Sequence, residues 1–184
     1  MPLIIIISSY LLDVITKLLI VKTLKLYEVK EIIGDVLRFK YIENKGMAFG
    51  LFSELPEPYK HLILLPIIFV AIGVVVYFYR SVHESKYHAK YTLALILGGA
   101  LGNLSDKLIG YIVYHQEFKF FYNRVVDFID VGIGTCRYCR WPTFNVADIA
   151  ITVGVLLLLM LILFGKDKDI FVKKKKPSDE PVNE

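Results

Sequence analysis

Long apolar runs alternate with polar segments along the chain. The four runs cover residues 2–21, 62–79, 91–113 and 143–164. Each is close to the length that crosses roughly 30 Å of hydrocarbon at about 1.5 Å of helix rise per residue. The pattern predicts an all-α membrane protein built as a bundle of four transmembrane helices. The first run has no basic flank before it and no small-residue cleavage site after it, so we expect a retained span rather than a removed signal peptide.

The polar segments between the runs predict a smaller second layer. In residues 35–43, Leu37, Phe39 and Tyr41 alternate with charged residues, which is the period-two pattern of a strand. The segment that follows, from Asn44 to Gly50, contains residues typical of a turn. We therefore expect a small β-sheet at the membrane surface. Residues 1–164 are expected to form one domain, and the charged residues 165–184 a disordered tail.

Composition agrees with a small polytopic membrane protein. The chain of 184 residues is 55% hydrophobic and has a mean hydropathy of +0.54. The net charge of +4 does not indicate nucleic-acid binding, because the basic residues lie beside apolar runs. Cys136 and Cys139 form a single C-x-x-C pair, which is weak evidence for zinc. We expect a disulfide or two free thiols there, and no metal.

The distribution of charge predicts an orientation. Four spans put both termini on one side, together with the short basic loop 80–90 and the lysine-rich tail. The positive-inside rule makes that side cytoplasmic. The loop at 22–60 is also basic, but it is longer and diluted by acids. Both long polar segments, 22–60 and 114–142, are therefore expected on the outer surface.

Several polar side chains interrupt the apolar runs. A charged residue at a helix centre costs roughly 2.5–3.5 kcal/mol on insertion scales, so a polar interior or cavity is usually needed to accept it. Asp13 and Lys17 are four apart on one helix face, and either neutralise each other or brace a polar interior. The predicted topology places the remaining polar residues in the outer half of the membrane, where one cavity would explain them: Asn103, Asp106, Asn145 and Asp148. Asn103 and Asp106 could equally form structural hydrogen bonds between helices.

Two carboxylates in such a cavity would support acid–base chemistry. Asp148 opens the last run, and Asp127 or Asp130 in the preceding loop could join it; spacing alone leaves both open. Two carboxylates that share a site hold one proton between them, so one can activate water while the other donates to a carbonyl oxygen. This is the chemistry of an aspartic hydrolase of peptide bonds. A serine nucleophile is a poor alternative, because Ser105 has no histidine on its helix face.

Five blocks of residues together resemble the bacterial lipoprotein signal peptidase family, also called signal peptidase II. The blocks are Asp13-x-x-x-Lys17, Asn44-x-Gly46-x-Ala48-Phe49-Gly50, Gly98-Gly99-x-x-Gly102-Asn103-x-x-Asp106, Val125-Val126-Asp127-Phe128 and Phe144-Asn145-x-Ala147-Asp148. The resemblance implies four transmembrane helices with an extracytoplasmic β-cradle and loop. It implies an aspartic endopeptidase of the bacterial inner membrane that cleaves prolipoproteins just before a diacylglyceryl-modified Cys. No metal or organic cofactor is implied.

The resemblance also implies roles for individual residues. It makes Asp127 and Asp148 the catalytic pair, and so selects Asp127 over Asp130. The substrate-binding residues that it implies are Asn44, Gly46, Asn103, Asp106, Lys107 and Asn145. Asp13 and Lys17 would support the site. Lys107 stands where the family usually has Arg, which reduces a forked contact to a point charge.

The expected partners are lipid-modified prolipoprotein signal peptides and membrane lipid, with no nucleic acid, and a monomer would suffice. A second hypothesis from another class is a non-enzymatic transporter or assembly factor that uses the intramembrane acids as an ion path. It would explain those acids, but it leaves the residue blocks in the two outer loops without a role.

Overall fold

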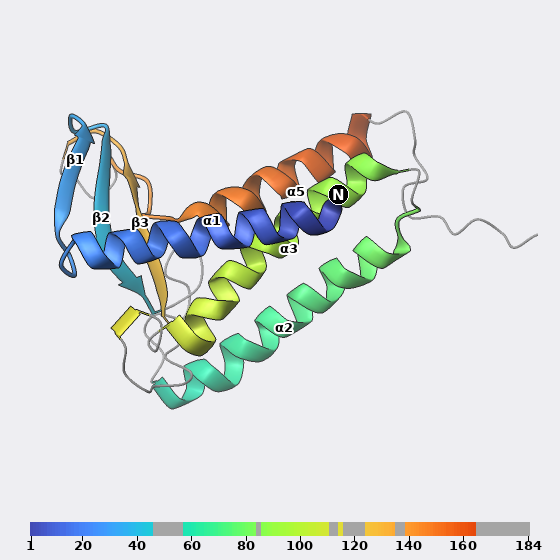
Figure 1. Ribbon diagram of the computed structural model, residues 1–184, viewed down its shortest axis with the longest axis horizontal. Helices are drawn as coiled ribbons and strands as arrows, with labels where there is room; N and C mark the ends of the chain where they lie inside the picture. Colours follow the sequence, from blue (N-terminus) through green and yellow to red (C-terminus); the bar gives the residue numbers. More distant parts are fainter. Residues whose placement is uncertain (46–56, 84–85, 111–113, 116–123, 135–138, 165–184) are drawn as a thin grey trace, which may run out of the picture.

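The computed structural model describes residues 1–45, 57–83, 86–110, 114–115, 124–134 and 139–164. The elements in chain order are α1 (Pro2–Thr23), β1 (Val29–Ile33), β2 (Leu37–Asn44), α2 (Glu57–Ser81), α3 (Tyr87–Ser105), the π-helical turn η2 (Asp106–Gly110), β3 (Val125–Val131) and α5 (Val146–Phe164). The helices form an elongated bundle, and the three strands lie together at one end of it (Figure 1).

The four predicted spans are confirmed, although their ends differ from the expected positions. Four helices in the described residues are long and apolar enough to cross a membrane. α2 begins at Glu57, earlier than the apolar run suggested, and contains Pro66 within it. α5 begins at Val146 and not at residue 143. The reason is that Phe144 is held in extended form, exchanging backbone hydrogen bonds with Ile129 of β3 at 2.8 and 3.1 Å.

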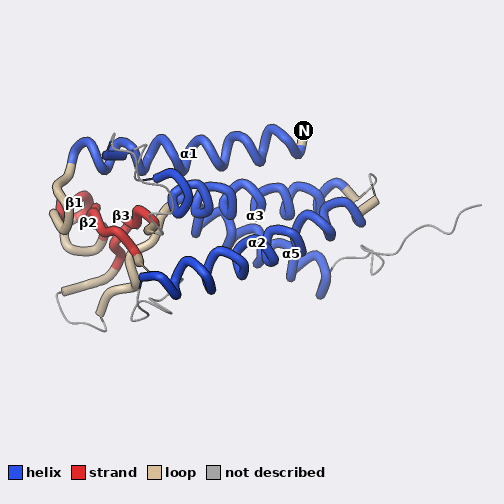
Figure 2. Tube along the Cα trace, turned by 90° about the horizontal axis from the view of Figure 1, so that it is seen from below, coloured by secondary structure: helices blue, strands red, loops and turns tan. Residues whose placement is uncertain are grey.

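α3 is the central helix, because it contacts α1, α2 and α5. Two glycines let α1 approach it. A Cβ at Gly98 would lie 1.8 Å from Ser9 Oγ and 2.7 Å from the Ile6 carbonyl, and one at Gly102 would lie 2.5 Å from Asp13 Oδ2. The four-residue spacing of the two glycines thus brings α1 into close contact with α3. Figure 2 shows α1 running alongside α3 for most of its length.

The strands form one antiparallel sheet in the order β1-β2-β3. The predicted strand is present as β2. β3 was expected only as an apolar stretch of a loop. Its first four residues are all buried, so the alternation that marks a half-exposed strand is missing from its sequence.

The sheet is attached to the end of α1 by an apolar cluster. Ile20 and Leu24 pack against Tyr41 of β2 and against Val126 and Phe128 of β3. These contacts fix β3, and with it Asp127, next to the ends of α1 and α5.

Candidate active site

Asp148 lies in the first turn of α5 and caps that helix reciprocally with Asn145. The backbone N–H of Asp148 donates to Asn145 Oδ1 at 2.9 Å, and the backbone N–H of Asn145 donates to Asp148 Oδ2 at 3.1 Å. This is the arrangement of a capping box, with the acid three residues after the N-cap. A carboxylate in the first turn also faces the positive end of the helix dipole, which stabilises its negative charge.

Asp127 lies on β3 and is 2% exposed. Its two oxygens accept hydrogen bonds from two amides. Asn44 Nδ2 donates to Oδ2 at 2.9 Å, and Asn145 Nδ2 donates to Oδ1 at 2.7 Å. The antiparallel register explains the first bond, because Ile42 pairs with Asp127 and Asn44 follows two residues later on the same strand.

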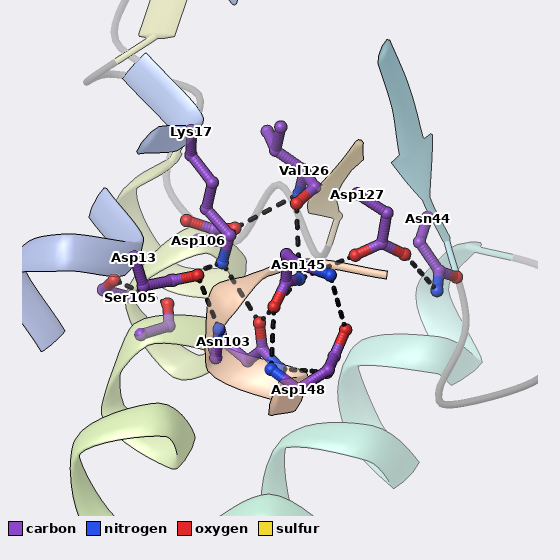
Figure 3. Close-up of polar contacts among 12 residues, drawn as sticks. Asp13, Lys17, Asn44, Asn103, Ser105, Asp106, Val126, Asp127, Asn145 and Asp148 are labelled. Atoms are coloured by element: carbon purple, nitrogen blue, oxygen red, sulfur yellow. Dashed lines mark hydrogen bonds and ion pairs between the residues drawn. The ribbon is translucent and has the colours of Figure 1, made fainter. Parts of the chain in front are cut away.

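Asn145 joins the two carboxylates. Its side chain is completely buried and contacts Asp127 through Nδ2, while its backbone N–H and Oδ1 hold Asp148. Figure 3 shows Asn145 between the two acids. A single residue at the head of α5 therefore sets the position of both.

The environment of Asp127 favours its protonated form. The pKa of Asp127 is raised to about 7. The main cause is burial, and the negative charge of the nearby Asp148 acts in the same direction. The hydrogen bond from Asn44, the positive charge of Lys17 and the hydrogen bond from Asn145 act in the opposite direction. The pKa nevertheless stays well above the usual value for aspartate, so Asp127 can hold a proton near neutral pH.

Behind the two acids lies a buried ionic cluster. Lys17 Nζ lies 2.6 Å from Asp13 Oδ2 and 2.8 Å from Asp106 Oδ2, and all three side chains are at most 1% exposed. Asp13 Oδ1 accepts the Ala147 backbone N–H at 2.9 Å. Asp106 accepts the Val126 backbone N–H at 3.1 Å and the Tyr114 hydroxyl at 2.5 Å. Asp13 thus links α1 to α5, and Lys17 links α1 through Asp106 to β3.

Asp130, the other acid that spacing left open, has different neighbours. Arg38 Nη2 lies 2.8 Å from Asp130 Oδ2, and Arg140 Nε lies 2.8 Å from Asp130 Oδ1. Burial acts against ionisation, but the hydrogen bonds and charges of the two arginines hold the pKa of Asp130 below its usual value. Asp130 therefore stays charged and paired, and it does not line the cavity described next.

A cavity of about 730 Å³ opens beside the two acids. Asp127, Asp148, Asn44 and Asn103 are among its polar lining, and most of the remaining wall is apolar. Most of the apolar wall comes from three helices: Ile67, Ile68, Ala71, Ile72 and Val75 of α2, Ile96, Ala100 and Leu104 of α3, and Ile149, Ile151 and Val153 of α5. This volume suits an apolar ligand that presents one polar group to the carboxylates.

The structure brings most of the expected site residues together. Asn44, Asn103, Lys107, Asp127 and Asp148 line the cavity, and Asn145 lies between the two acids. Asp106 does not line the cavity but belongs to the ionic cluster. Gly46 lies outside the described residues. Cys139 is disulfide-bonded. Cys136, the other cysteine of the sequence, lies outside the described residues, as Gly46 does.

Some lining residues were not expected from the sequence. Trp141, Pro142 and Thr143 line the cavity just before α5, and nothing in their spacing indicated this. The capping of α5 was detectable, since Asn145 and Asp148 before an apolar run have capping-box spacing. In the described part of the chain, no group of three or more His, Cys, Asp or Glu could hold a metal ion.

Four membrane-length helices with two neighbouring aspartates beside an apolar cavity define the class of an aspartic peptidase of the membrane. The model of the family described as "Signal peptidase (SPase) II" matches residues 5–164. The chain belongs to this family. It has lipoprotein signal peptidase activity and removes the signal peptides of prolipoproteins.

Individual relatives agree with the family match. A lipoprotein signal peptidase of Aquifex aeolicus is 38% identical over 162 residues, which cover 87% of this chain and 84% of the relative. One of Geobacter sulfurreducens is 36% identical and covers 84% of this chain and 86% of the relative. A bacterial membrane enzyme solved by the in meso method at 2.3 Å resolution has a TM-score of 0.69 at 27% identity. That match covers 95% of this chain and 93% of the other.

Proposed function

We propose that Asp127 and Asp148 are the catalytic pair and that they cleave the peptide bond just before a diacylglyceryl-modified Cys. The observation that carries this assignment is the position of Asn145, whose side chain donates to the Asp127 carboxylate and whose backbone N–H donates to the Asp148 carboxylate, beside an apolar cavity. A lipidated Cys preceded by an apolar signal peptide is a substrate that fits such a cavity. The alternative ion path does not account for a cavity of this size and apolar lining.

The two acids differ in ways that assign their roles. The Asp148 carboxylate accepts hydrogen bonds from Asn103 Nδ2 at 2.9 Å and from the Asn145 backbone N–H. It also lies in the first turn of α5, so its negative charge is stabilised. Asp127 is buried, and its pKa, raised to about 7, lets it hold a proton near neutral pH. We therefore assign Asp148 as the general base and Asp127 as the general acid in the first step. The pair titrates as a unit, so its apparent pKa values belong to both residues.

The chemical steps follow from these roles. Asp148 takes a proton from water as the water oxygen attacks the scissile carbonyl carbon, and Asp127 gives its proton to the carbonyl oxygen. The product is a neutral tetrahedral diol. On collapse, Asp148 gives its proton to the leaving nitrogen, the C–N bond breaks, and a diol hydroxyl returns its proton to Asp127. The pair then holds one proton again, as at the start.

The amide side chains divide between holding the acids and contacting the substrate. Asn44 and Asn103 line the cavity, and the amide of each donates to one carboxylate, Asn44 to Asp127 and Asn103 to Asp148. We assign both amides to the boundary between the acids and the substrate backbone. Lys107 lines the same cavity and is placed to contact a polar substrate group. Gly46 keeps its expected role near the substrate. Asp106, whose oxygens contact Lys17, Tyr114 and Val126, is assigned to supporting the site.

We also propose the orientation of the chain in the membrane. Both termini are cytoplasmic, and the sheet and the two acids lie at the outer surface of the bacterial inner membrane. The basic loop 80–90 supports this orientation through the positive-inside rule. A single chain contributes all the residues of the proposed site, so a monomer bound to membrane lipid is sufficient.

Cleavage by the purified, detergent-solubilised enzyme tests the proposal. A lipid-modified prolipoprotein should be cut so that the lipid-bearing Cys becomes the new N-terminus, as read by mass spectrometry. Asp148→Asn should be inactive, whereas Asp35→Asn, which changes a half-exposed acid of the sheet, should remain active. Equal cleavage of the unlipidated precursor would overturn the substrate assignment. Cleavage by Asp148→Asn would overturn the assignment of the base.

A further inference from the structure

Lys17 has three polar contacts inside the protein. Its side chain is completely buried, and its ammonium contacts Asp13, Asp106 and the Oδ1 atom of Asn103, the last at 3.1 Å. The two carboxylates already supply more than the charge needed to neutralise it. The contact with Asn103 therefore does something other than balance charge.

Asn103 has an amide whose oxygen is fully engaged. Its Oδ1 accepts from Lys17 Nζ at 3.1 Å and from Asn145 Nδ2 at 3.1 Å, while its Nδ2 donates to Asp148 Oδ1 at 2.9 Å. An amide could point either way at an uncharged site. Here the reversed orientation would aim its NH₂ group at an ammonium and another NH₂ group, and would remove the donor from Asp148. Figure 3 shows the chain of contacts from Lys17 through Asn103 to Asp148.

We propose that Lys17 is a positioning residue for the reaction. By donating to Asn103 Oδ1, it fixes the amide so that Nδ2 points at Asp148 and holds that carboxylate in the orientation that the reaction needs. A cation on α1 thus acts on the base of α5 through a side chain of α3. The inference rests on the proposed role of Asp148, and it assigns to the buried ion pair a part in turnover beyond support of the fold.

A purely structural role for Lys17 makes a different prediction. Removing one member of a buried ion pair is strongly destabilising, but replacing the whole pair with neutral residues is often tolerated. The paired variant Asp13→Asn/Lys17→Met leaves Asp106 with the Tyr114 hydroxyl and the Val126 N–H as donors. If Lys17 only stabilised the fold, the folded fraction of this variant would turn over like the wild type.

The test is a cycle of four enzymes: wild type, the paired variant, Asn103→Leu, and the combination of both. Turnover of a lipid-modified prolipoprotein is measured per folded enzyme, with folding checked by thermal unfolding. The paired variant and Asn103→Leu should each lower kcat by roughly 10- to 100-fold, the size expected for one lost hydrogen bond to a charged group. The combination should be no more than about threefold worse than Asn103→Leu, because both changes remove the same donor from Asp148.

The pH dependence of activity tests the role of Lys17 independently of protein stability. The groups that act on Asp127 are Asp148 of α5 and Lys17 of α1, together with the amides of Asn44 and Asn145, and Lys107 lines the same cavity. Since the charge of Lys17 lowers the pKa of Asp127, its loss should move the alkaline limb of activity to higher pH.

The outcomes separate the inference from the assignment beneath it. The role of Lys17 would be overturned if the combined variant lost kcat by the product of the two separate losses. It would also be overturned if the folded paired variant had the kcat of the wild type. In both cases Asp148→Asn would remain inactive. Cleavage by Asp148→Asn would instead overturn the catalytic pair. If the paired variant does not fold, the neutral triple Asp13→Asn/Lys17→Met/Asp106→Asn takes its place in the cycle and decides by the same comparison.

Discussion

Asn145 has two separable functions, one as a helix cap and one as the link between the acids. Its Oδ1 accepts the Asp148 backbone N–H, and its Nδ2 donates to Asp127. Serine is also a preferred N-cap residue, but its hydroxyl is shorter than the asparagine amide. The two functions can therefore be tested apart by one pair of substitutions.

We expect Asn145→Ser to keep the stability of the fold and lose catalysis. The serine can cap α5 but cannot bridge to Asp127, so kcat should fall by roughly 100-fold while the unfolding temperature stays near that of the wild type. Asn145→Ala should lose the same activity and also about 1 kcal/mol of stability, because the cap is gone. Thermal unfolding and turnover of the two variants measure this. Wild-type activity in Asn145→Ser would contradict the bridging function.

The pH dependence of cleavage follows from the raised pKa of Asp127. As an acid whose pKa is raised to about 7, it keeps its proton below that pH and loses it as the pH rises. Since the proposed first step needs the protonated form, kcat/KM should fall above about pH 7, approaching tenfold per unit. A rate profile from pH 5 to 9 checks this sign. Activity that rises steadily through pH 8 would exclude Asp127 as the acid.

Helices and strands of this protein differ in how far the sequence predicts them. The four spans were predictable because long apolar runs have few alternatives in a membrane protein. β2 was predictable from the alternation of Leu37, Phe39 and Tyr41. β3 was not, because a strand buried along most of its length shows no alternation. The start of α5 was misplaced, since the backbone pairing of Phe144 with β3 decides it rather than hydropathy.

Residues of the site were predictable to a similar degree. The types and order of Asp127, Asn145 and Asp148 carried the family resemblance, and the fold brings these residues together. The contacts of Asn103 could not be predicted, because they depend on how three helices pack. The same holds for Asp130, whose charged form is set by Arg38 and Arg140 from distant positions.

The contact between α1 and α3 depends on the lack of a side chain at Gly98. A Cβ there would lie 1.8 Å from Ser9 Oγ. We expect Gly98→Ala to separate the helices and lower the unfolding temperature by several degrees, about 1–3 kcal/mol of overpacking. Gly73→Ala is the matched control, since a Cβ at Gly73 on α2 meets no atom within 4 Å. Equal behaviour of the two variants would show that close approach at Gly98 is not needed.

The molecule as a whole combines a membrane-length bundle with a sheet at one end, and that arrangement dictates where chemistry can occur. The acids lie where β3 meets the head of α5, and the cavity extends from there between α2, α3 and α5. A substrate anchored in the bilayer by lipid and by an apolar segment would thus meet the acids without leaving the membrane. The energetic cost of a buried carboxylate becomes useful at this boundary, because it keeps one proton on the pair.

The proposed orientation predicts the results of reporter fusions. Green fluorescent protein fused after Phe164 should fluoresce, and alkaline phosphatase at the same position should be inactive, because that end is cytoplasmic. Fusion of the phosphatase after residue 45, at the end of β2, should give an active enzyme outside. The reverse pattern at both positions would show that the chain has the opposite orientation, with the acids at the cytoplasmic face.

The most direct test of the catalytic pair compares single and double replacements of its members. Asp127→Asn, Asp148→Asn and the double variant should all fold, because asparagine has the size of aspartate and its oxygen can keep one of the two hydrogen bonds that each carboxylate accepts. Residues that act as one unit lose their effect together, so each single variant should be as inactive toward a lipid-modified prolipoprotein as the double variant. Cleavage retained by either single variant at more than about one hundredth of the wild-type kcat would contradict a shared role for Asp127 and Asp148.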